Sequence, residues 1–170
     1  GSFRTPFNPR YSSHMKSDYT EGNAFQWSFF APHDMDNFIS TIGGKKELET
    51  RLDTLFTTSS QVDGEEASGD ITGLIGQYAH GNEPSHHMAY LYNWTDSPWK
   101  GQERLDQIMQ NFYTNAPDGI IGNEDCGQMS AWYVMSALGF YQIAPGIPVY
   151  TLGRPMIDKA LIHVKGGIFE

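Results

Sequence analysis

Apolar residues recur at helical spacing in three stretches of the chain. Within residues 35–42 they stand at positions i, i+3, i+4 and i+7, which places four side chains on one helical face. Asp34 is suited to cap the start of this helix and Gly43 to end it. Residues 48–56 predict a second amphipathic helix, and residues 100–114 repeat the pattern in a third. These segments predict a largely helical chain.

Three further segments indicate helices and two indicate strands. We expect helices at residues 23–30, at 84–95, where a proline suits the first helical position, and at 127–138. The last of these is apolar nearly all round, which predicts burial on both sides. Strand signals appear only late, at residues 149–152 and 160–164. The predicted fold is mainly α-helical with a short C-terminal β segment.

The composition excludes several classes of protein. The 170 residues suffice for one domain. Eleven Lys plus Arg against twenty Asp plus Glu give a net charge of -9, which opposes binding to nucleic acid. The longest apolar run, residues 131–141, is shorter than the roughly twenty residues of a membrane span. The single cysteine, Cys126, follows two acidic residues that disfavour a thiolate, so we expect it to be a buried, small apolar residue.

Aromatic residues and glycines are abundant in this chain. It has 10 Phe, 9 Tyr, 4 Trp and 18 Gly, while only 18% of its residues are charged. Many of them surround three acidic loops, at residues 19–23, 80–84 and 122–127. Each loop precedes a predicted helix. If consecutive helices alternate in direction, loops at the same end come together, so we expect these three to line one pocket.

Carboxylates in these loops are candidates for acid–base chemistry. Glu21, Glu83, Glu124 and Asp125 lie among glycines and aromatic residues rather than on charged helical faces. Cleavage of a glycosidic bond needs one carboxylic acid to protonate the leaving oxygen and one carboxylate to activate water or attack the sugar. The alternative is that Glu21 and Glu83 only cap helices. Three such loops in one chain leave both interpretations open.

Histidines cluster around the second loop and raise the question of a metal. His80, His86 and His87 flank Glu83, but their spacing does not match H-E-x-x-H, and adjacent histidines on a helix point in different directions. This argues against zinc. Asn82, Glu83 and the loop carbonyls instead suit a hard cation such as calcium, which prefers oxygen ligands.

Taken together, four ordered motifs resemble a known family. They are DYTEGNAFQW at 18–27, PHD at 32–34, GLIGQYAHGNEPSHH at 73–87 and GNEDCGQMSAWY at 122–133. As a set they closely resemble glycoside hydrolase family 92, the calcium-dependent exo-acting α-mannosidases, and the resemblance runs from about Phe3 to the end. It implies an (α/α)6 barrel, hydrolysis with inversion, and a calcium ion (Ca2+) that binds sugar hydroxyls.

Family members are several times longer than this chain. The resemblance therefore implies that residues 3–145 form part of the catalytic barrel and that residues 146–170 begin a following β segment. It also implies a mannose-containing glycan, a mannan or an N-glycan, as the substrate. We expect a secreted, periplasmic or cell-surface protein, with any export signal upstream of Gly1. An exposed barrel wall would favour self-association.

The resemblance and local physics together suggest a role for each carboxylate. Asp125 lies just before the predicted helix at 127–138, whose N-terminal partial charge favours an ionised general base. Glu21, among aromatic residues, is our choice for the general acid, and Glu83 is the competing choice. Glu83 also suits a cation ligand together with Asn82. Glu124 is a further catalytic candidate. An inverting pair should stand roughly 6.5 to 9.5 Å apart.

The resemblance also implies which residues contact the sugar. The combination of His80, Asn82 and Glu83 is similar to the family pattern associated with α-1,2 linkages. The expected sugar contacts are Asn23, Phe25, Gln26, Trp27, His80 and Trp132. Phe25 stands where the family has tryptophan, which affects one sugar contact and not the chemistry.

Two functions from different classes follow from these observations. The first is an α-mannosidase that releases terminal, α-1,2-linked mannose. The second is a truncated, catalytically inactive carbohydrate-binding or structural fragment of such an enzyme, because part of a barrel exposes an apolar wall and lacks other contributions to the pocket. A different all-α sugar-processing enzyme is a further alternative.

Overall fold

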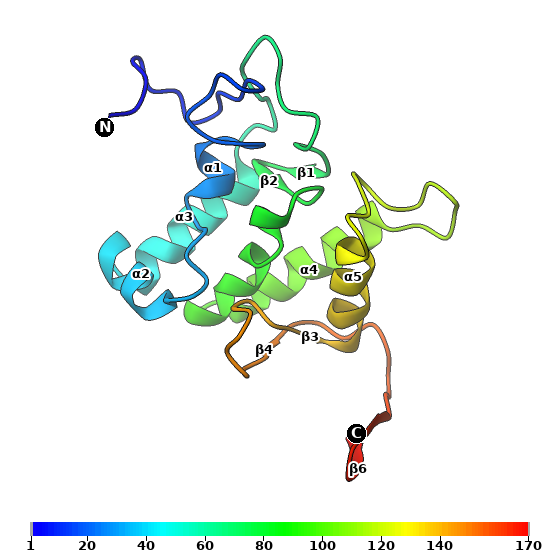
Figure 1. The fold of residues 1–170 in the computed structure, drawn as a ribbon. Coiled ribbons are helices and arrows are strands. Elements are labelled where there is room, and N and C mark those ends of the chain that lie inside the picture. The colour runs from blue at the N-terminus through cyan, green and yellow to red at the C-terminus, as the bar shows by residue number, and fades with distance from the viewer. Residues whose placement is uncertain (1, 170) are drawn as a thin grey trace.

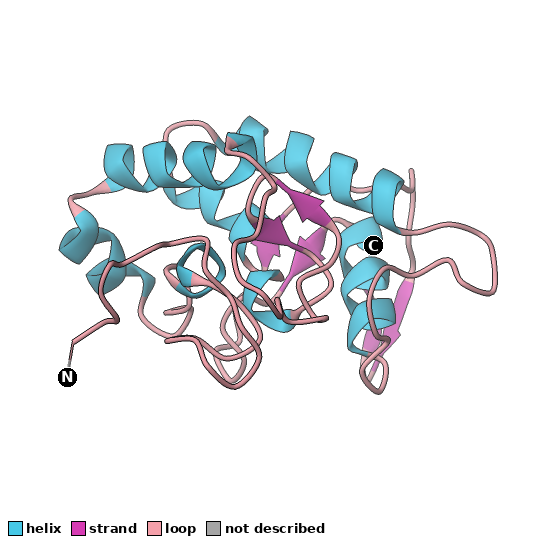
Figure 2. Ribbon diagram, turned by 90° about the horizontal axis from the view of Figure 1, so that it is seen from above, coloured by secondary structure: helices cyan, strands magenta, loops and turns pink. Residues whose placement is uncertain are grey.

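Helices joined by long loops make up most of the chain (Figure 1). The computed structural model describes residues 2–169. The α-helices are α1 (Ala24–Trp27), α2 (Met35–Ile42), α3 (Lys45–Thr57), α4 (Pro98–Phe112) and α5 (Gln128–Leu138), and the 3₁₀-helices are η1 (Glu83–Ser85) and η2 (Met88–Trp94). Seen from above, helices line one side and loops, including the N-terminal stretch, gather on the other (Figure 2).

The strands are short and pair only as antiparallel two-stranded units. They are β1 (Leu74–Ile75) with β2 (Tyr78–Ala79), β3 (Phe140–Tyr141) with β4 (Thr151–Leu152), and β5 (Ile162–Val164) with β6 (Gly167–Phe169). The two predicted strands correspond to β4 and β5. Their partners β3 and β6, and the β1–β2 hairpin, were not predicted, because pairs of this length carry little alternation in sequence.

The caps of α2 are those that the sequence predicts. The Asp34 side chain accepts a hydrogen bond from the backbone N–H of Asn37 at 3.2 Å. Gly43 ends the helix with φ 111°, a left-handed conformation that favours glycine. The predicted helices at 48–56 and 100–114 are confirmed as α3 and α4.

Three predicted helices differ from the structure. The segment 23–30 is helical only over α1, because Phe29 turns into the core while Phe30 is exposed. The segment 84–95 forms η1 and η2 rather than one α-helix, with His86 and His87 between them. Burial of α5 on both sides was also wrong: Met129 and Trp132 are buried, but Val134 is 55% exposed.

The core forms around η2, which packs against both α3 and α4. Residues 88–92 of η2 are fully buried. From α3 the core receives Leu48, Leu52, Leu55 and Phe56, and from α4 it receives Leu105, Ile108 and Met109. Because η2 has apolar neighbours on several sides, it has no polar face, and its sequence could not reveal a helical period.

A polar cluster at the edge of this core ties α3 to α4. Lys100 on α4 contacts Glu49 at 2.7 Å and Asp53 at 2.6 Å, both on α3. The Tyr92 hydroxyl of η2 donates to Asp53 at 2.8 Å. Hydrogen bonds to Asp53 and Glu49 raise the pKa of Lys100. Helices α3, α4 and η2 are therefore joined by a common set of charge-assisted hydrogen bonds.

The C-terminal residues first return to the helical body and then leave it. Strand β4 pairs with β3 across the predicted division at residues 145 and 146, and the Asn93 side chain donates to the Leu152 carbonyl at 3.1 Å. Beyond Met156, the β5–β6 hairpin projects away from the helices (Figure 1). Several large apolar side chains between residues 147 and 169 are exposed.

None of the helices within residues 2–169 combines the length and the apolar character that crossing a bilayer requires.

Leu52 tests the contribution of the core. Its side chain is fully buried, so Leu52→Ala should lower the free energy of unfolding by about 2–5 kcal/mol, as measured by urea denaturation. The matched control is Leu152→Ala, at a leucine that is 73% exposed, where a change below about 0.5 kcal/mol is expected. Equal effects at the two leucines would contradict the assigned core.

Candidate functional site

The first acidic loop is held in an unusual backbone conformation. Glu21 has φ 50°, in the left-handed region that residues other than glycine seldom adopt, and its side chain is exposed. The Trp27 indole N–H donates to the Thr20 carbonyl at 2.8 Å and closes α1 over the loop. A Cβ at Gly22 would lie 2.9 Å from that indole nitrogen, so only glycine fits there. Trp27 thereby fixes the position of Glu21.

Two residues of this first motif are structural rather than exposed to a ligand. Asn23 is fully buried, and its side chain accepts from the Phe25 N–H at 3.0 Å and donates to Gln77 Oε1 at 2.9 Å. Gln26 accepts from the Asn23 N–H at 2.7 Å and donates to the Gln77 carbonyl at 2.6 Å. The sugar contacts at Asn23 and Gln26 stay predictions; in the described residues both side chains are bound by a helix cap and by Gln77.

The second acidic loop is tied to the first. Asn82 donates from Nδ2 to the Glu21 carbonyl at 2.9 Å, and its Oδ1 accepts from the Glu83 N–H at 3.2 Å. Between Tyr78 and Tyr92 every residue is buried except Glu83. The Glu83 side chain is therefore exposed to solvent, while the buried residues on both sides of it hold its backbone in place. This exposure sets Glu83 apart from its neighbours.

The third loop packs directly on the second. A Cβ at Gly122 would lie 3.0 Å from the Gly81 Cα, so the two backbones touch. Asp125 and Cys126 follow with φ 52° and 57°, and Gly127 with φ 99°. The two non-glycine residues, Asp125 and Cys126, are strained in this conformation, and such strain concentrates at functional sites. The prediction that the three acidic loops come together agrees with these contacts.

Glu124 has a structural role at the start of α5. Its carboxylate accepts from the N–H groups of Gly127 and of Ser130, the latter at 3.0 Å. Hydrogen bonds from the Ser130 side chain and backbone, with the Gly127 N–H, lower the pKa of Glu124. Helix capping, the alternative considered for Glu21 and Glu83, thus fits Glu124. Asp125 next to it is exposed.

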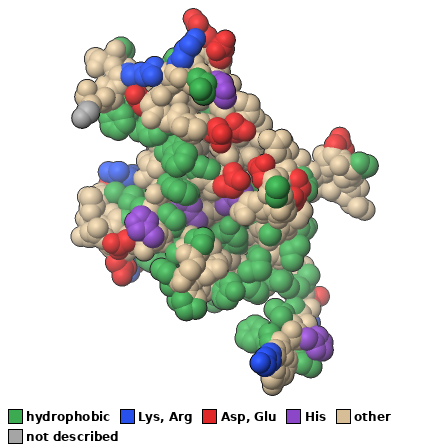
Figure 3. Space-filling view, viewed as in Figure 1, with side chains coloured by type: hydrophobic (Ala, Val, Ile, Leu, Met, Phe, Trp, Pro, Cys, Tyr) green, Lys and Arg blue, Asp and Glu red, His purple; other side chains and the backbone are tan. Residues whose placement is uncertain are grey.

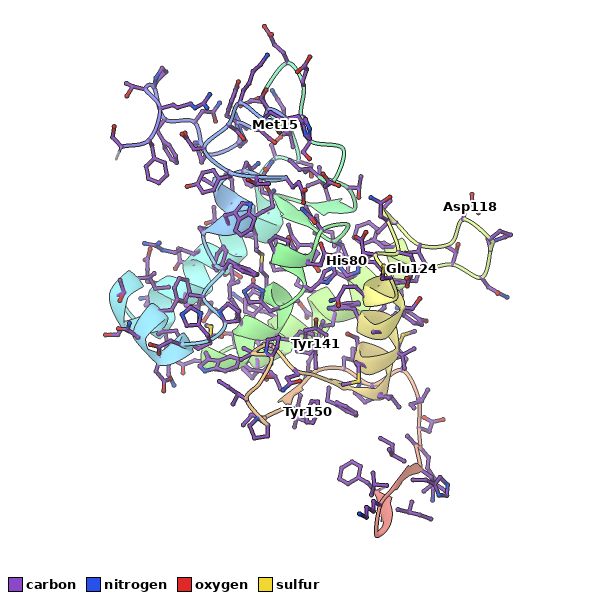
Figure 4. The ribbon with its side chains drawn as sticks, viewed as in Figure 1. Met15, His80, Asp118, Glu124, Tyr141 and Tyr150 are labelled. Atoms are coloured by element: carbon purple, nitrogen blue, oxygen red, sulfur yellow. The ribbon has the colours of Figure 1, made fainter. Side chains whose placement is uncertain are left out.

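Acidic side chains gather in the middle of one face of the molecule, with histidine just below them (Figure 3). Glu124 lies at the start of α5 and His80 beside it, at the end of β2 (Figure 4). Tyr113 joins the two regions: its hydroxyl bonds to His80, and the Glu124 charge contributes to raising the pKa of Tyr113, mainly a result of burial.

His80 is fully buried and cannot contact a sugar in this conformation. Its Nδ1 accepts from the Tyr78 hydroxyl at 2.7 Å, and its Nε2 donates to the Tyr113 hydroxyl at 2.7 Å, which in turn donates to the Met129 carbonyl at 3.3 Å. Burial, with a smaller effect from His86, lowers the pKa of His80 to about 2. The sugar contact at His80 stays a prediction; in the described residues His80 is a buried side chain that links Tyr78 to Tyr113.

His86 and Trp132 extend the buried network. The His86 Nε2 donates to the His80 carbonyl at 3.0 Å, and the Trp132 indole N–H donates to the His86 carbonyl at 2.9 Å. The Trp132 ring is fully buried and lies 4.4 Å from the His80 ring, between centroids. Trp132 therefore packs in the core instead of facing a ligand. Of the predicted sugar contacts, Phe25 and Trp27 remain partly accessible.

The prediction for Cys126 was wrong, and two glutamines had no predicted role. Cys126 is exposed, not buried, within a turn whose backbone is left-handed. Gln77, fully buried, connects three segments, and Gln128 bonds to His86. The one signal in the sequence is for Gln77, a polar residue within the largely apolar stretch at 73–79.

The described residues do not form a complete calcium site. Within residues 2–169 no group of three or more His, Cys, Asp or Glu side chains is placed to hold a metal ion. Asn82 Oδ1 and the exposed Glu83 carboxylate are adjacent oxygen donors, but calcium takes 6–8 oxygen ligands. Asn82 and Glu83 can therefore form only part of a calcium site.

A cavity within residues 2–169 lies away from Glu21, Glu83 and Asp125. It has a volume of about 270 Å³ and lies between the start of α2 and residues 143–151, with His33, Asp34 and Trp94 in its walls. Glu21, Glu83 and Asp125 instead lie on an open surface. Within residues 2–169, the three carboxylates thus stand on one surface that no pocket wall encloses.

Comparison with known proteins gives consistent matches. A family model described as the glycosyl hydrolase family 92 catalytic domain matches residues 1–169. A family GH92 α-mannosidase of Bacteroides thetaiotaomicron, solved in complex with mannoimidazole, is 44% identical with a TM-score of 0.81, covering 89% of this chain and 20% of that chain. A family GH92 inverting mannosidase of the same organism is 34% identical with a TM-score of 0.76, covering 98% of this chain and 23% of that chain.

A curated protein of Arthroderma benhamiae, named an uncharacterized secreted glycosidase, is 26% identical over 151 residues. The alignment covers 89% of this chain and 17% of that protein. The chain thus spans about a fifth of the length of the relatives it matches.

The buried histidines predict a pH dependence of stability. Burial lowers the pKa of His86 from 6.5 to about 4, and it also lowers the pKa of His87. Below about pH 6.5 the unfolded chain binds protons that the folded chain excludes, so stability falls as the pH falls. Between about pH 7 and about pH 5, burial of the His86 imidazole alone should cost on the order of 2 kcal/mol, and burial of His87 adds a cost of the same sign; both are measured by urea denaturation.

The matched control for this prediction is His14→Gln, at an exposed histidine, which should leave the pH dependence unchanged. His87→Gln should flatten the curve. A free energy of unfolding that stays constant between about pH 7 and about pH 5 would contradict the neutral, buried state of these imidazoles.

Proposed function

The chain belongs to glycosyl hydrolase family 92, and on that basis we propose that it supplies the acid–base face of an exo-acting α-mannosidase. The observation that carries the proposal is the junction of three acidic loops. Asn82 binds the backbone of Glu21, and Gly122 packs on Gly81. Three exposed carboxylates are thereby held on one rigid base, as cleavage between two carboxyl groups requires.

The proposed architecture of the whole enzyme is an (α/α)6 barrel. Residues 3–145 would form part of it, and residues 146–170 would begin the β segment that follows. The helix-rich body and the projecting β5–β6 hairpin support this division. The β3–β4 pair crosses the boundary and would anchor the second part to the first.

We assign the general base to Asp125. It lies in the turn before α5, three residues ahead of Gln128, and its backbone carbonyl accepts from the Gln128 N–H at 3.2 Å, so the residue lies at the positive end of the helix. A base in this position can take a proton from water as the water attacks the anomeric carbon. Attack from the side opposite the leaving group inverts the configuration. The left-handed backbone at Asp125 supports a functional role.

We assign the general acid to Glu21, with Glu83 as the competing choice. Glu21 shares the left-handed conformation of Asp125 and is braced by Trp27 and Asn82. Its exposure means that residues 2–169 do not desolvate it, so an acid here would depend on bound substrate to exclude water. Glu83 projects from the more rigid segment.

The proposed substrate is terminal mannose, α-1,2-linked, on a mannan or an N-glycan. Phe25 and Trp27, partly accessible next to Glu21, would offer flat surfaces to the sugar ring. Because His80 is buried, it would influence the preference for α-1,2-linked mannose only indirectly, through the position of Glu83. A secreted, periplasmic or cell-surface location is proposed as well, supported by the name of the secreted glycosidase relative.

Calcium dependence is proposed for the complete enzyme. Asn82 and Glu83 would provide two of the oxygen ligands, and other ligands would have to come from sugar hydroxyls, water or further protein. Calcium would supply a fixed positive charge that orients sugar hydroxyls.

A second candidate function is favoured by the open surface around the carboxylates. In that case residues 1–170 on their own form a carbohydrate-binding or structural unit without catalysis. Exposed apolar side chains at residues 147–169 would then promote self-association, which sedimentation at several concentrations would detect.

Substitution of Asp125 tests the assignment of the base. Asp125→Asn should lower kcat for release of mannose from α-1,2-mannobiose by about 10²–10⁴-fold, because the amide cannot take a proton from water. The assay uses the chain alone and a protein of full family length that includes it. The control is Asp118→Asn, on the projecting loop before α5 (Figure 4), which should leave kcat unchanged.

A leaving-group test separates Glu21 from Glu83. If Glu21 is the acid, Glu21→Gln should lose activity on mannobiose but recover it on a dinitrophenyl mannoside, whose leaving group needs no proton. Glu83→Gln should be impaired on both substrates. The opposite pattern would transfer the role of acid to Glu83, and full activity of Asp125→Asn would refute the proposed mechanism.

Removal of calcium provides an independent test. Dialysis against a chelator should abolish mannose release, and calcium should restore it where magnesium does not, since a site with shared sugar ligands needs a large, flexible coordination shell. Glu83→Gln should raise the calcium concentration needed for half-maximal activity. Glu103→Gln, an exposed change on α4, serves as the control. Activity that is unaffected by the chelator would remove calcium from the proposal.

A further inference from the structure

The loop that carries Asp125 is in a conformation that it would not keep by itself. Asp125, Cys126 and Gly127 have φ values of 52°, 57° and 99° in succession. Each non-glycine residue in the left-handed region costs free energy that surrounding contacts must offset. The contacts that hold this loop therefore decide where the Asp125 carboxylate lies.

Contacts within the loop cannot set its position relative to the rest of the site. Glu124 accepts from the N–H groups of Gly127 and Ser130, but all three residues belong to the same turn and the helix that follows it. This cap preserves the shape of the turn. Gly122 packs on Gly81 at the start of the loop, and a further contact is needed to fix the strained turn itself relative to Glu83.

Gln128 makes such a contact. As the first residue of α5, directly after the strained turn, it donates from Nε2 to His86 Nδ1 at 3.1 Å. His86 is 3% exposed and ends η1, where its N–H donates to the Glu83 carbonyl at 3.0 Å. This side-chain hydrogen bond links the first residue of the helix that follows Asp125 to the turn that carries Glu83.

The partners of His86 leave the ring no freedom. Its Nε2 donates to the His80 carbonyl at 3.0 Å, which requires the proton on Nε2 and leaves Nδ1 as the acceptor for Gln128. The Trp132 indole N–H donates to the His86 carbonyl at 2.9 Å. Both ring nitrogens are therefore occupied, so His86 is not available to a ligand.

We propose that Gln128 and His86 are a positioning pair that fixes the Asp125 loop against the segment carrying Glu83. This inference rests on the proposed function for its catalytic meaning, but the geometry that it asserts can be tested without enzymatic activity. Neither residue touches substrate in this arrangement. Both act through the backbone of the turns they join.

The single cysteine makes a direct test possible. Cys126 is exposed within the strained turn, so a nitroxide attached to it reports the mobility of this loop alone. In the complete chain, Gln128→Met keeps the length and helix propensity of the side chain but removes the N–H donor. The electron paramagnetic resonance spectrum should narrow relative to the unsubstituted chain. The control Gln102→Met, at an exposed position of α4, should leave the spectrum unchanged.

Hydrogen exchange separates positioning from a general loss of stability. In Gln128→Met, amides of residues 122–130 should exchange about three- to ten-fold faster, as expected for the loss of one hydrogen bond, while those of α3 keep their rates. Unchanged spectra and exchange would overturn the proposal, and so would faster exchange in residues 122–130 and α3 alike. Failure of the mannosidase assays would instead affect only the proposed function.

Discussion

The buried run from Tyr78 to Tyr92 is the constraint on which the rest of the molecule depends. It enters through β2, passes through η1 and η2, and is enclosed by α3 and α4. Glu83 alone reaches the surface along its length. Buried polar side chains of this run form specific hydrogen bonds to the neighbouring loops. Asn82 holds the first loop in this way, and His86 holds the start of α5.

Strain and support are paired at the two loops that flank this run. Glu21 and Asp125 both have left-handed backbones, and each is next to a side chain that restrains it: Trp27 for the first and Gln128 for the second. Strain of this kind persists only where surrounding contacts maintain it. Both carboxylates are exposed to solvent, outside the neutral interior.

The sequence predicted the elements with strong local signals and failed where tertiary contacts decide. Asp34 and Gly43 define α2 because caps act locally. The 3₁₀ character of η2 depends on enclosure by other helices, which periodicity does not contain. Likewise, the motifs identified Asn23, Gln26, His80 and Trp132 as residues of the site, but a motif gives residue types and not the direction of a side chain. All four support the site from inside.

This division of roles follows from the cost of burying charge. Inside the protein, an ionised imidazole would lose its hydration, so His80 and His86 remain neutral and connect segments through hydrogen bonds. Glu21, Glu83 and Asp125 stand outside this interior and are exposed to solvent. A frame of neutral donors and acceptors can fix carboxylates in place without adding charges that would compete for protons with them. The chain therefore separates the residues that set geometry from those suited to chemistry, although both kinds occur in the same short motifs.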